Sequence, residues 1–266
     1  MFSRTIFADK RTEKIATHQR LVRAARRTTL QYAPQKAKFH LPSSKQINHF
    51  EGKNGPDGLA GKHNIGDFPK EMLNPNEKRP ELLGQIDYHL KTLRRAYRRR
   101  DSIRTAFELA WSEHLIVDGL TPAHHHNYHE QNKEVDPREL EEINSLLKRI
   151  FTPGDGFTDT FKRNWKKAGP RGFATNHILF EAGIDFIVMP LPASRLSVEL
   201  DPRDVRRVKQ GKFSQVYMDS VRKVAKLNLF ERYEHSGWTN DLVDDVRNIL
   251  LPECVKMISL GWLSAL

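Results

Sequence analysis

Side chains that could bind a metal ion are concentrated in residues 111–130. His114 and Asp118 stand four positions apart, so a helix would place both on one face, within reach of a single ion. Pro122 would end that helix, and His124 follows as the chain turns away. Imidazole nitrogens and carboxylate oxygens are common zinc ligands, so this segment predicts a metal site.

A second pair, His177 and Glu181, repeats the four-residue spacing further along the chain. Either pair alone also fits an ordinary polar pair on a helix surface. Two such pairs and a histidine at a helix break could, however, converge inside a helical bundle. The only cysteine, Cys254, excludes a disulfide framework and a thiolate zinc site, so a metal site here would use histidine and carboxylate ligands.

Apolar periodicity predicts an all-α, multi-helix bundle that forms a single domain over residues 1–266. No β alternation and no internal repeat occurs. The expected helices cover residues 10–32, 80–100, 102–119, 137–151, 173–186 and 213–235, with others starting near 201 and 239. Prolines and glycines predict a long irregular loop over 33–79, contributing to the site, and a further loop over 152–172. The apolar tail 249–266 is interpreted as a core helix, with a membrane-surface segment as the alternative.

The order and spacing of these residues closely resemble the zinc-dependent phospholipase C family, whose superfamily includes the single-strand-specific zinc nucleases of fungi and plants. That signature has His, Asp four later, Pro four after that and His two further on, then His-x-x-x-Glu or Asp on a later helix. His18 is similar to the family's early helical histidine ligand. His49, in NHFEGKNGPDG, is similar to a family loop whose histidine binds metal. The resemblance covers roughly residues 18–181, includes an insertion at 125–172, and implies an all-α fold.

The resemblance implies up to three zinc ions per chain. His49, His114 and Asp118 would hold one ion. Asp118 would bridge to a second ion, which would also take His18.

His124, His177 and Glu181 would hold the third ion of the implied cluster. Metal-bound hydroxide would then attack phosphorus in line, with Asp118 as the catalytic bridging ligand. The implied activity is zinc-dependent phosphodiester hydrolysis, with phospholipid or nucleic acid as the substrate.

The alternative is a catalytically impaired helical scaffold that binds nucleic acid or anionic lipid through basic helices. The family uses an aspartate before the His49-like position and an N-terminal tryptophan that binds zinc. This chain has no Asp or Glu between Ala33 and Asn48, and no tryptophan before Trp111.

Positive charge is in excess: 44 Lys and Arg face 33 Asp and Glu, a net charge of +11 with histidine neutral. Such a surplus favours polyanionic partners. A tryptophan among basic residues predicts a polyanion-binding patch, although the tryptophan could instead be an anchor packed under a basic loop. The candidate residues are Arg163, Trp165, Lys166, Lys167 and Arg171.

Hydropathy predicts no integral membrane span, because charges or prolines interrupt every apolar stretch before about 20 residues. Charges at Arg4, Asp9, Lys10 and Arg11 likewise interrupt any apolar core of a secretory signal. The expected location is therefore the cytoplasm, and the sequence does not predict an oligomeric state.

Overall fold

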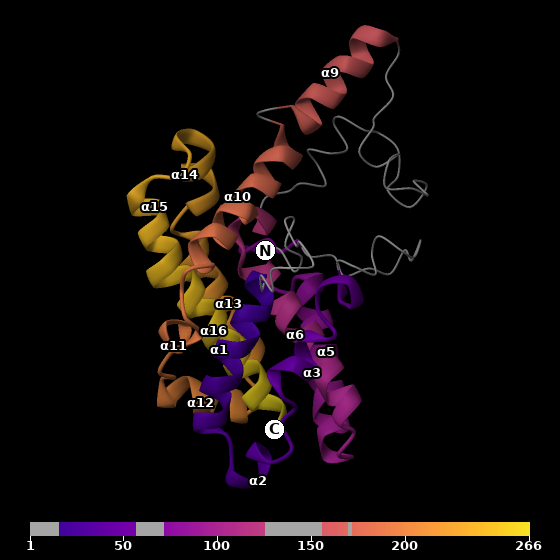
Figure 1. Ribbon diagram of the computed structural model, residues 1–266, viewed down its shortest axis with the longest axis vertical. Helices are drawn as coiled ribbons and strands as arrows, with labels where there is room; N and C mark the ends of the chain where they lie inside the picture. The colour runs from indigo at the N-terminus through magenta and orange to yellow at the C-terminus, as the bar shows by residue number, and fades with distance from the viewer. Residues whose placement is uncertain (1–15, 57–71, 126–155, 170–171) are drawn as a thin grey trace.

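The computed structural model describes residues 16–56, 72–125, 156–169 and 172–266, and within these ranges it contains helices and no strand (Figure 1). The expected all-α fold is confirmed. None of the helices in the described ranges combines the length and apolar character needed to cross a bilayer.

The C-terminal helix α16 (Leu251–Ala265) forms the centre of the core and packs against α1 (Thr17–Tyr32), α6 (Ser102–Leu120) and α12 (Pro202–Lys209). It is buried on nearly every side, and the Trp262 indole N–H donates to the Leu109 carbonyl at 3.2 Å. A helix that is apolar all round belongs in a core, so the expectation for residues 249–266 is confirmed.

Two helices that lie next to α16 carry predicted metal ligands: α1 carries His18, and α6 carries His114 and Asp118. α5 (Glu81–Arg98) packs along α6, and the Asp101 side chain caps α6 by accepting from the Arg104 amide at 2.9 Å. The α1 helix starts where the Asp185 carboxylate accepts from the Thr17 amide at 3.2 Å, which satisfies one exposed donor of its first turn. This bond also ties α1 to α10 (Phe173–Val188).

Part of the predicted irregular stretch 33–79 is helical. It contains α2 (Gln35–Lys38), α3 (Ser44–Asn48) and the 3₁₀ turn η1 (Gly52–Asn54). A capping box between Ser43 and Gln46 starts α3, which explains why so short a segment forms a helix. Residues 57–71 lie outside the described ranges.

The loop predicted over residues 152–172 is wrong in part, because Phe157–Ala168 form the helix α9. Gly156, at φ 106°, begins this helix, and Arg163 donates to Asp159 one turn earlier at 2.7 Å. The basic residues and glycines that indicated a loop therefore flank or cover a helix, which extends past the other helices beyond α10 in Figure 1. The helix expected at 137–151 lies outside the described residues.

The C-terminal part folds as a series of helices around α16. They are α11 (Ala193–Leu196), α12, α13 (Phe213–Ala225), α14 (Leu229–Ser236), α15 (Asn240–Asp245) and the π-turn η4 (Val246–Leu250). The single helix expected over 213–235 is wrong, because Asn228 adopts φ 48° and breaks it into α13 and α14. The π-turn precedes Pro252, which has no N–H to continue an ordinary helical ladder.

Candidate metal centre

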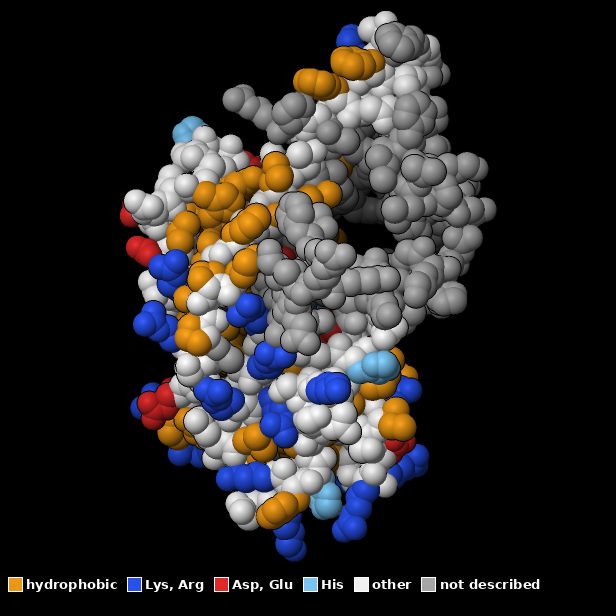
Figure 2. Space-filling view, viewed as in Figure 1, with side chains coloured by type: hydrophobic (Ala, Val, Ile, Leu, Met, Phe, Trp, Pro, Cys, Tyr) orange, Lys and Arg blue, Asp and Glu red, His pale blue; other side chains and the backbone are white. Residues whose placement is uncertain are grey.

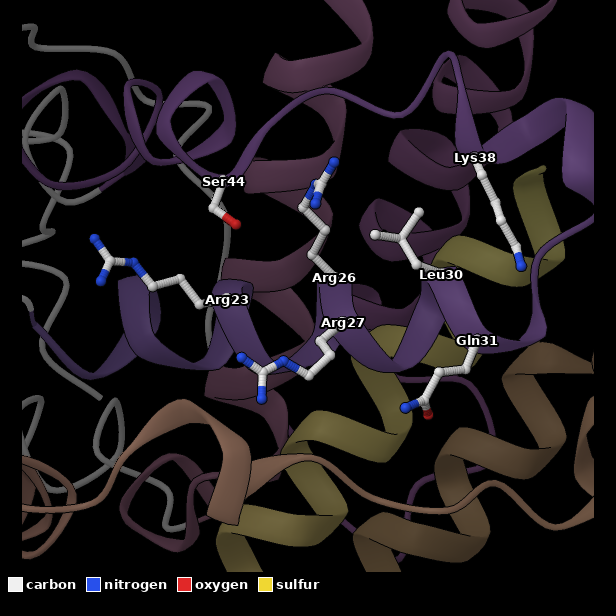
Figure 3. A pocket seen from close by; sticks show the side chains of 7 residues that line it. All are labelled: Arg23, Arg26, Arg27, Leu30, Gln31, Lys38 and Ser44. Carbon is white, nitrogen blue, oxygen red and sulfur yellow. The ribbon is translucent and has the colours of Figure 1, made fainter.

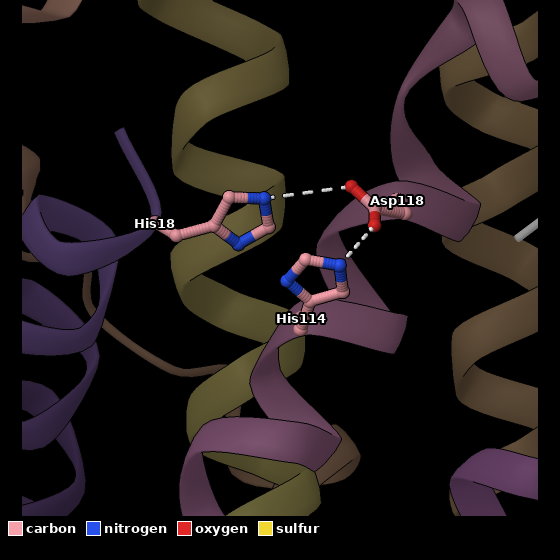
Figure 4. A group of neighbouring side chains, drawn as sticks. All are labelled: His18, His114 and Asp118. Atoms are coloured by element: carbon pink, nitrogen blue, oxygen red, sulfur yellow. Dashed lines mark ion pairs between the residues drawn. The ribbon is translucent and has the colours of Figure 1, made fainter. Parts of the chain in front are cut away.

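One cluster of metal-binding side chains forms where α1 meets α6. His114 and Asp118 share a face of α6, and the His114 Nε2 lies 2.9 Å from Asp118 Oδ2. His18, in the first turn of α1, stacks on His114 with ring centroids 4.6 Å apart and places its Nε2 3.5 Å from Asp118 Oδ1 (Figure 4). The two carboxylate oxygens thus face two imidazoles, and the ligand atoms of these residues lie within 4.8 Å of one another.

A second cluster joins the end of α6 to α10. The 3₁₀ turn η2 (Pro122–His125) follows α6, and the His124 side chain in it is buried. The Glu181 Oε1 lies 3.0 Å from His124 Nε2 and 3.2 Å from His177 Nε2. These ligand atoms also lie within 4.8 Å of one another. The His177 side chain is 19 % exposed, so this cluster has access to solvent.

The carboxylates of both clusters are held ionised. Burial would raise the pKa of Asp118, whereas hydrogen bonds from His114 and His18 contribute to lowering it, and the resulting pKa lies well below its usual value. Burial would likewise raise the pKa of Glu181, hydrogen bonds from His124 and His177 contribute to lowering it, and the resulting pKa also lies well below its usual value.

The buried histidine of the first cluster is shifted in the opposite direction. Burial would lower the pKa of His18, but Glu113 and Asp118 raise it to about 10. Without a cation, the protonated His18 imidazole offsets part of the charge of the buried carboxylates. A divalent ion would displace a proton from this ring, because ligating imidazole is neutral.

His49, the remaining predicted ligand, is not brought into these clusters. It is exposed at the C-terminal end of α3, where its ring meets the edge of Phe50 at a centroid distance of 5.0 Å. The chain then turns through Gly52 at φ 62°, and Glu51 becomes the buried side chain of this segment.

The sequence reasoning missed Glu51 and Glu113. Both are buried, and with His18 they form a third group whose ligand atoms lie within 4.8 Å of one another. Glu113 could have been predicted from its position beside His114 in a strongly apolar helix. For Glu51, the sequence offered only its position two residues after His49.

The predicted polyanion patch lies partly on α9. Arg163 is paired with Asp159, while Lys166 is exposed and Trp165 is 56 % exposed and stacks on Phe161. The Trp165 side chain is therefore not an anchor packed under a basic loop. The Lys167 side chain and Arg171 lie outside what the structure describes.

A second basic surface, separate from the candidate patch on α9, is a groove lined by arginines. This groove of about 810 Å³ runs along the outer side of α1 and contains neither metal cluster (Figure 3). Its lining residues are Arg23, Arg26, Arg27, Leu30, Gln31, Lys38 and Ser44. The Arg26 Nε donates to the Pro42 carbonyl at 2.6 Å, which fixes this guanidinium against the α2–α3 segment.

The donor sets of the clusters fit divalent zinc, since imidazole and carboxylate are its ordinary ligands. Both carboxylate oxygens of Glu51 are buried and accept no hydrogen bond from the described residues, which is the environment that a cation would complete. The geometry therefore fits metal binding on the chemistry of its own residues.

Comparison with known proteins shows that the fold is distantly similar to that of a phospholipase C. The similar solved structure is that of Clostridium perfringens alpha-toxin isolated from avian strain SWCP, with a TM-score of 0.54 and 12 % sequence identity. The match covers 95 % of this chain and 63 % of the toxin chain, so this chain spans less than two thirds of that protein. At this identity the likeness shows the fold alone. No family model and no curated protein matches the sequence.

Proposed function

We propose that this protein is a zinc-dependent phosphodiester hydrolase of the phospholipase C type, with phospholipid as its substrate. The observation that carries the proposal is the convergence of two histidine–carboxylate clusters from separate parts of the chain. His124 meets Glu181 across 57 positions, and His18 reaches Asp118 from another helix. These are the positions at which the sequence resembles the phospholipase C family.

The first cluster would hold two ions side by side. His114 Nε2 and Asp118 Oδ2 would bind one, and His18 would bind a second beside it. The rigid placement of these side chains on packed helices would keep both positions ready for binding.

The second cluster would hold a further ion through His124, His177 and Glu181. Zinc bound in such clusters supplies Lewis acidity and lowers the pKa of a coordinated water. The partial exposure of His177 gives a phosphate group a route to this position.

Exposed apolar side chains beside the second cluster favour phospholipid over nucleic acid. Ile178 and Leu179 follow His177 on α10 and are 47 % and 48 % exposed. Phe161 and Trp165 are further exposed apolar side chains on α9, which contacts α10. A membrane surface would cover such side chains, whereas a nucleic-acid backbone would not bury the aliphatic ones.

The test is zinc content and hydrolysis, measured on the full chain. The zinc-loaded protein should release the headgroup from phosphatidylcholine vesicles, and chelation should abolish this activity. Asp118→Asn should lower the rate at least about a hundredfold, since catalytic sites lose this much when a central ligand is removed. Asp219→Asn, the same change at an exposed position on α13, should leave the rate unchanged. A zinc-free wild-type protein, or full activity in Asp118→Asn, would refute the proposal.

The groove of Figure 3 supports the second candidate, a catalytically impaired scaffold that binds nucleic acid or anionic lipid. Arg23, Arg27 and Lys38 give it a positive lining suited to phosphate groups. For this candidate, the double change Arg23→Glu and Arg27→Glu should abolish binding to anionic vesicles or single-stranded DNA, and wild-type protein should show no hydrolysis. Hydrolysis that persists in the double variant would support the enzyme instead.

A further inference from the structure

Two buried carboxylates lie on the side of the stacked His18 and His114 rings that faces away from Asp118. Glu113 is fully buried and Glu51 is 3 % exposed. Both Glu113 oxygens face His18 Nδ1, at 3.2 and 3.3 Å, and the nearer Glu51 oxygen lies 3.6 Å from His114 Nδ1. Each imidazole is therefore flanked by carboxylates at both of its nitrogens.

The surroundings of Glu51 fit a carboxylate that binds a cation. Both of its oxygens are buried without a hydrogen bond from the described residues. Glu113 has His18 as its hydrogen-bonding partner. Two carboxylates buried this close together, with Asp118 on the other side of the rings, repel one another unless a positive charge lies between them.

The number of ligands points the same way. Catalytic zinc sites in proteins commonly have three protein ligands and an open position. His18 with Asp118 alone supplies two, and His49, the residue expected to contribute to this region, is exposed. Glu51 and Glu113 are further donors that the fold places within 4.8 Å of a His18 nitrogen.

We propose that His18, Glu51 and Glu113 together hold a divalent cation, next to the one that His114 and Asp118 would hold. The cation takes the place of the proton that His18 Nδ1 otherwise shares with Glu113, and His18 Nε2–H then donates to Asp118. One nitrogen and two carboxylates form a donor set suited to Zn²⁺ or Mn²⁺. This site rests on the proposed function for the role of its ion, but its binding is measurable without any activity.

The test counts ions bound to the full chain. Chelated protein is reloaded with Zn²⁺ or, separately, Mn²⁺, desalted, and analysed for metal per chain. Glu51→Gln and Glu113→Gln should each bind one ion fewer than wild type, while Glu51→Asp and Glu113→Asp, which keep a carboxylate, should bind the full number more weakly. Glu108→Gln is the matched control, because Glu108 is fully buried on the same helix α6 but pairs with Arg104 and His89. It should keep the wild-type number.

A stability measurement separates a ligand from a structural carboxylate. Added Zn²⁺ should raise the melting temperature of wild type, and this rise should shrink in Glu51→Gln. The metal-free Glu51→Gln protein should melt no lower than metal-free wild type, because Glu51 makes no hydrogen bond to lose. A lower melting temperature without metal, together with an unchanged ion count, would show a structural role and overturn the inference.

An anomalous difference map of zinc-loaded wild-type crystals tests the site without any variant. A peak between His18, Glu51 and Glu113 is expected, and peaks confined to the other positions would overturn the inference. If this ion binds and the protein hydrolyses no phosphodiester, the proposed function fails and the inference stands. If the ion is absent and hydrolysis proceeds, the inference fails and the proposed function stands.

Discussion

At the scale of single residues, Asp118 links two histidines from different helices. One oxygen lies 2.9 Å from His114 and the other 3.5 Å from His18. This buried carboxylate has a pKa well below its usual value, to which hydrogen bonds from both imidazoles contribute. The same relation between Glu181 and its two histidines recurs in the second cluster. Asp118 and Glu181 are thus buried carboxylates that keep their negative charge, and a cation site needs such groups.

Cys254 should be chemically inert in the folded protein. It lies on α16 and is fully buried, and this burial, reinforced by Glu113, Glu253 and Asp118, raises the pKa of the thiol well above its ordinary value. An ordinary thiol is about half ionised near pH 9, whereas Cys254 should stay protonated there.

A colorimetric thiol reagent measures this directly. At pH 9 the native protein should react at the rate of unfolding, and denatured protein should release one equivalent at once. Rapid reaction of one thiol per native chain would contradict the expectation.

At the scale of elements, α6 and the turn that follows it set the positions of four of the candidate ligands. The helix carries Glu113, His114 and Asp118, and its end at Thr121 lets η2 direct His124 back towards α10. Gly119 makes this packing possible. A Cβ there would lie 2.2 Å from the hydroxyl oxygen of Tyr217 and 2.6 Å from Leu82 Cδ2.

Gly119→Ala should therefore destabilise the protein. Tyr217 is fully buried and donates to the Ile116 carbonyl at 3.0 Å, so it cannot move without breaking this bond. The expected loss is about 1–3 kcal/mol in the free energy of unfolding, measured by urea denaturation. The loss should be accompanied by weaker zinc binding, since Gly119 adjoins Asp118.

Gly84→Ala is the control for this change. Gly84 lies in α5, and an added Cβ there would meet no atom within 4 Å. This variant should gain about 0.5–1 kcal/mol, because alanine is the better helix former. Equal effects of the two substitutions would show that close packing at Gly119 is not the cause.

At the scale of the whole molecule, the two ends of one face differ in their exposed side chains. On the face shown in Figure 2, hydrophobic side chains gather in the upper part, near α10, and lysine and arginine side chains in the lower part. Below the apolar region, the groove along α1 is lined by arginines. The proposed action on phospholipid would place the apolar side chains near α10 against the membrane.

Replacing exposed aromatic residues on α9 should weaken action on membranes. The double change Phe161→Ser and Trp165→Ser removes side chains that are 57 % and 56 % exposed. Loss of two such side chains from a lipid contact should reduce vesicle hydrolysis at least about tenfold. Hydrolysis of a soluble short-chain phosphodiester should be unchanged, because neither residue belongs to a metal cluster.

The matched control is Ile103→Ser. Ile103 is 73 % exposed at the start of α6, on a different helix from the proposed contact. It should leave both activities unchanged. An equal loss on soluble and vesicle substrates in the double variant would refute a membrane role for α9.

Much of the candidate site followed from local chemistry in the sequence. The spacing of four put His114 with Asp118 and His177 with Glu181, because helical geometry alone places such residues on one face. Residue composition and apolar periodicity gave wrong predictions at two places along the chain. Residues 157–168 carry loop-like composition and form a helix, and Asn228 breaks a helix that the apolar pattern alone would continue.

Tertiary structure alone decided which further carboxylates lie beside the first cluster. Helical periodicity cannot show that Glu51, which follows α3, comes close to His114 on α6, since that contact depends on how the intervening turn packs. The same packing leaves His49 exposed two residues away. The sequence by itself determined an all-α protein with histidine and carboxylate pairs at helical spacing. Burial at the junction of α1, α3 and α6 decided that Glu51 and Glu113, and not His49, share that interior with His18 and His114.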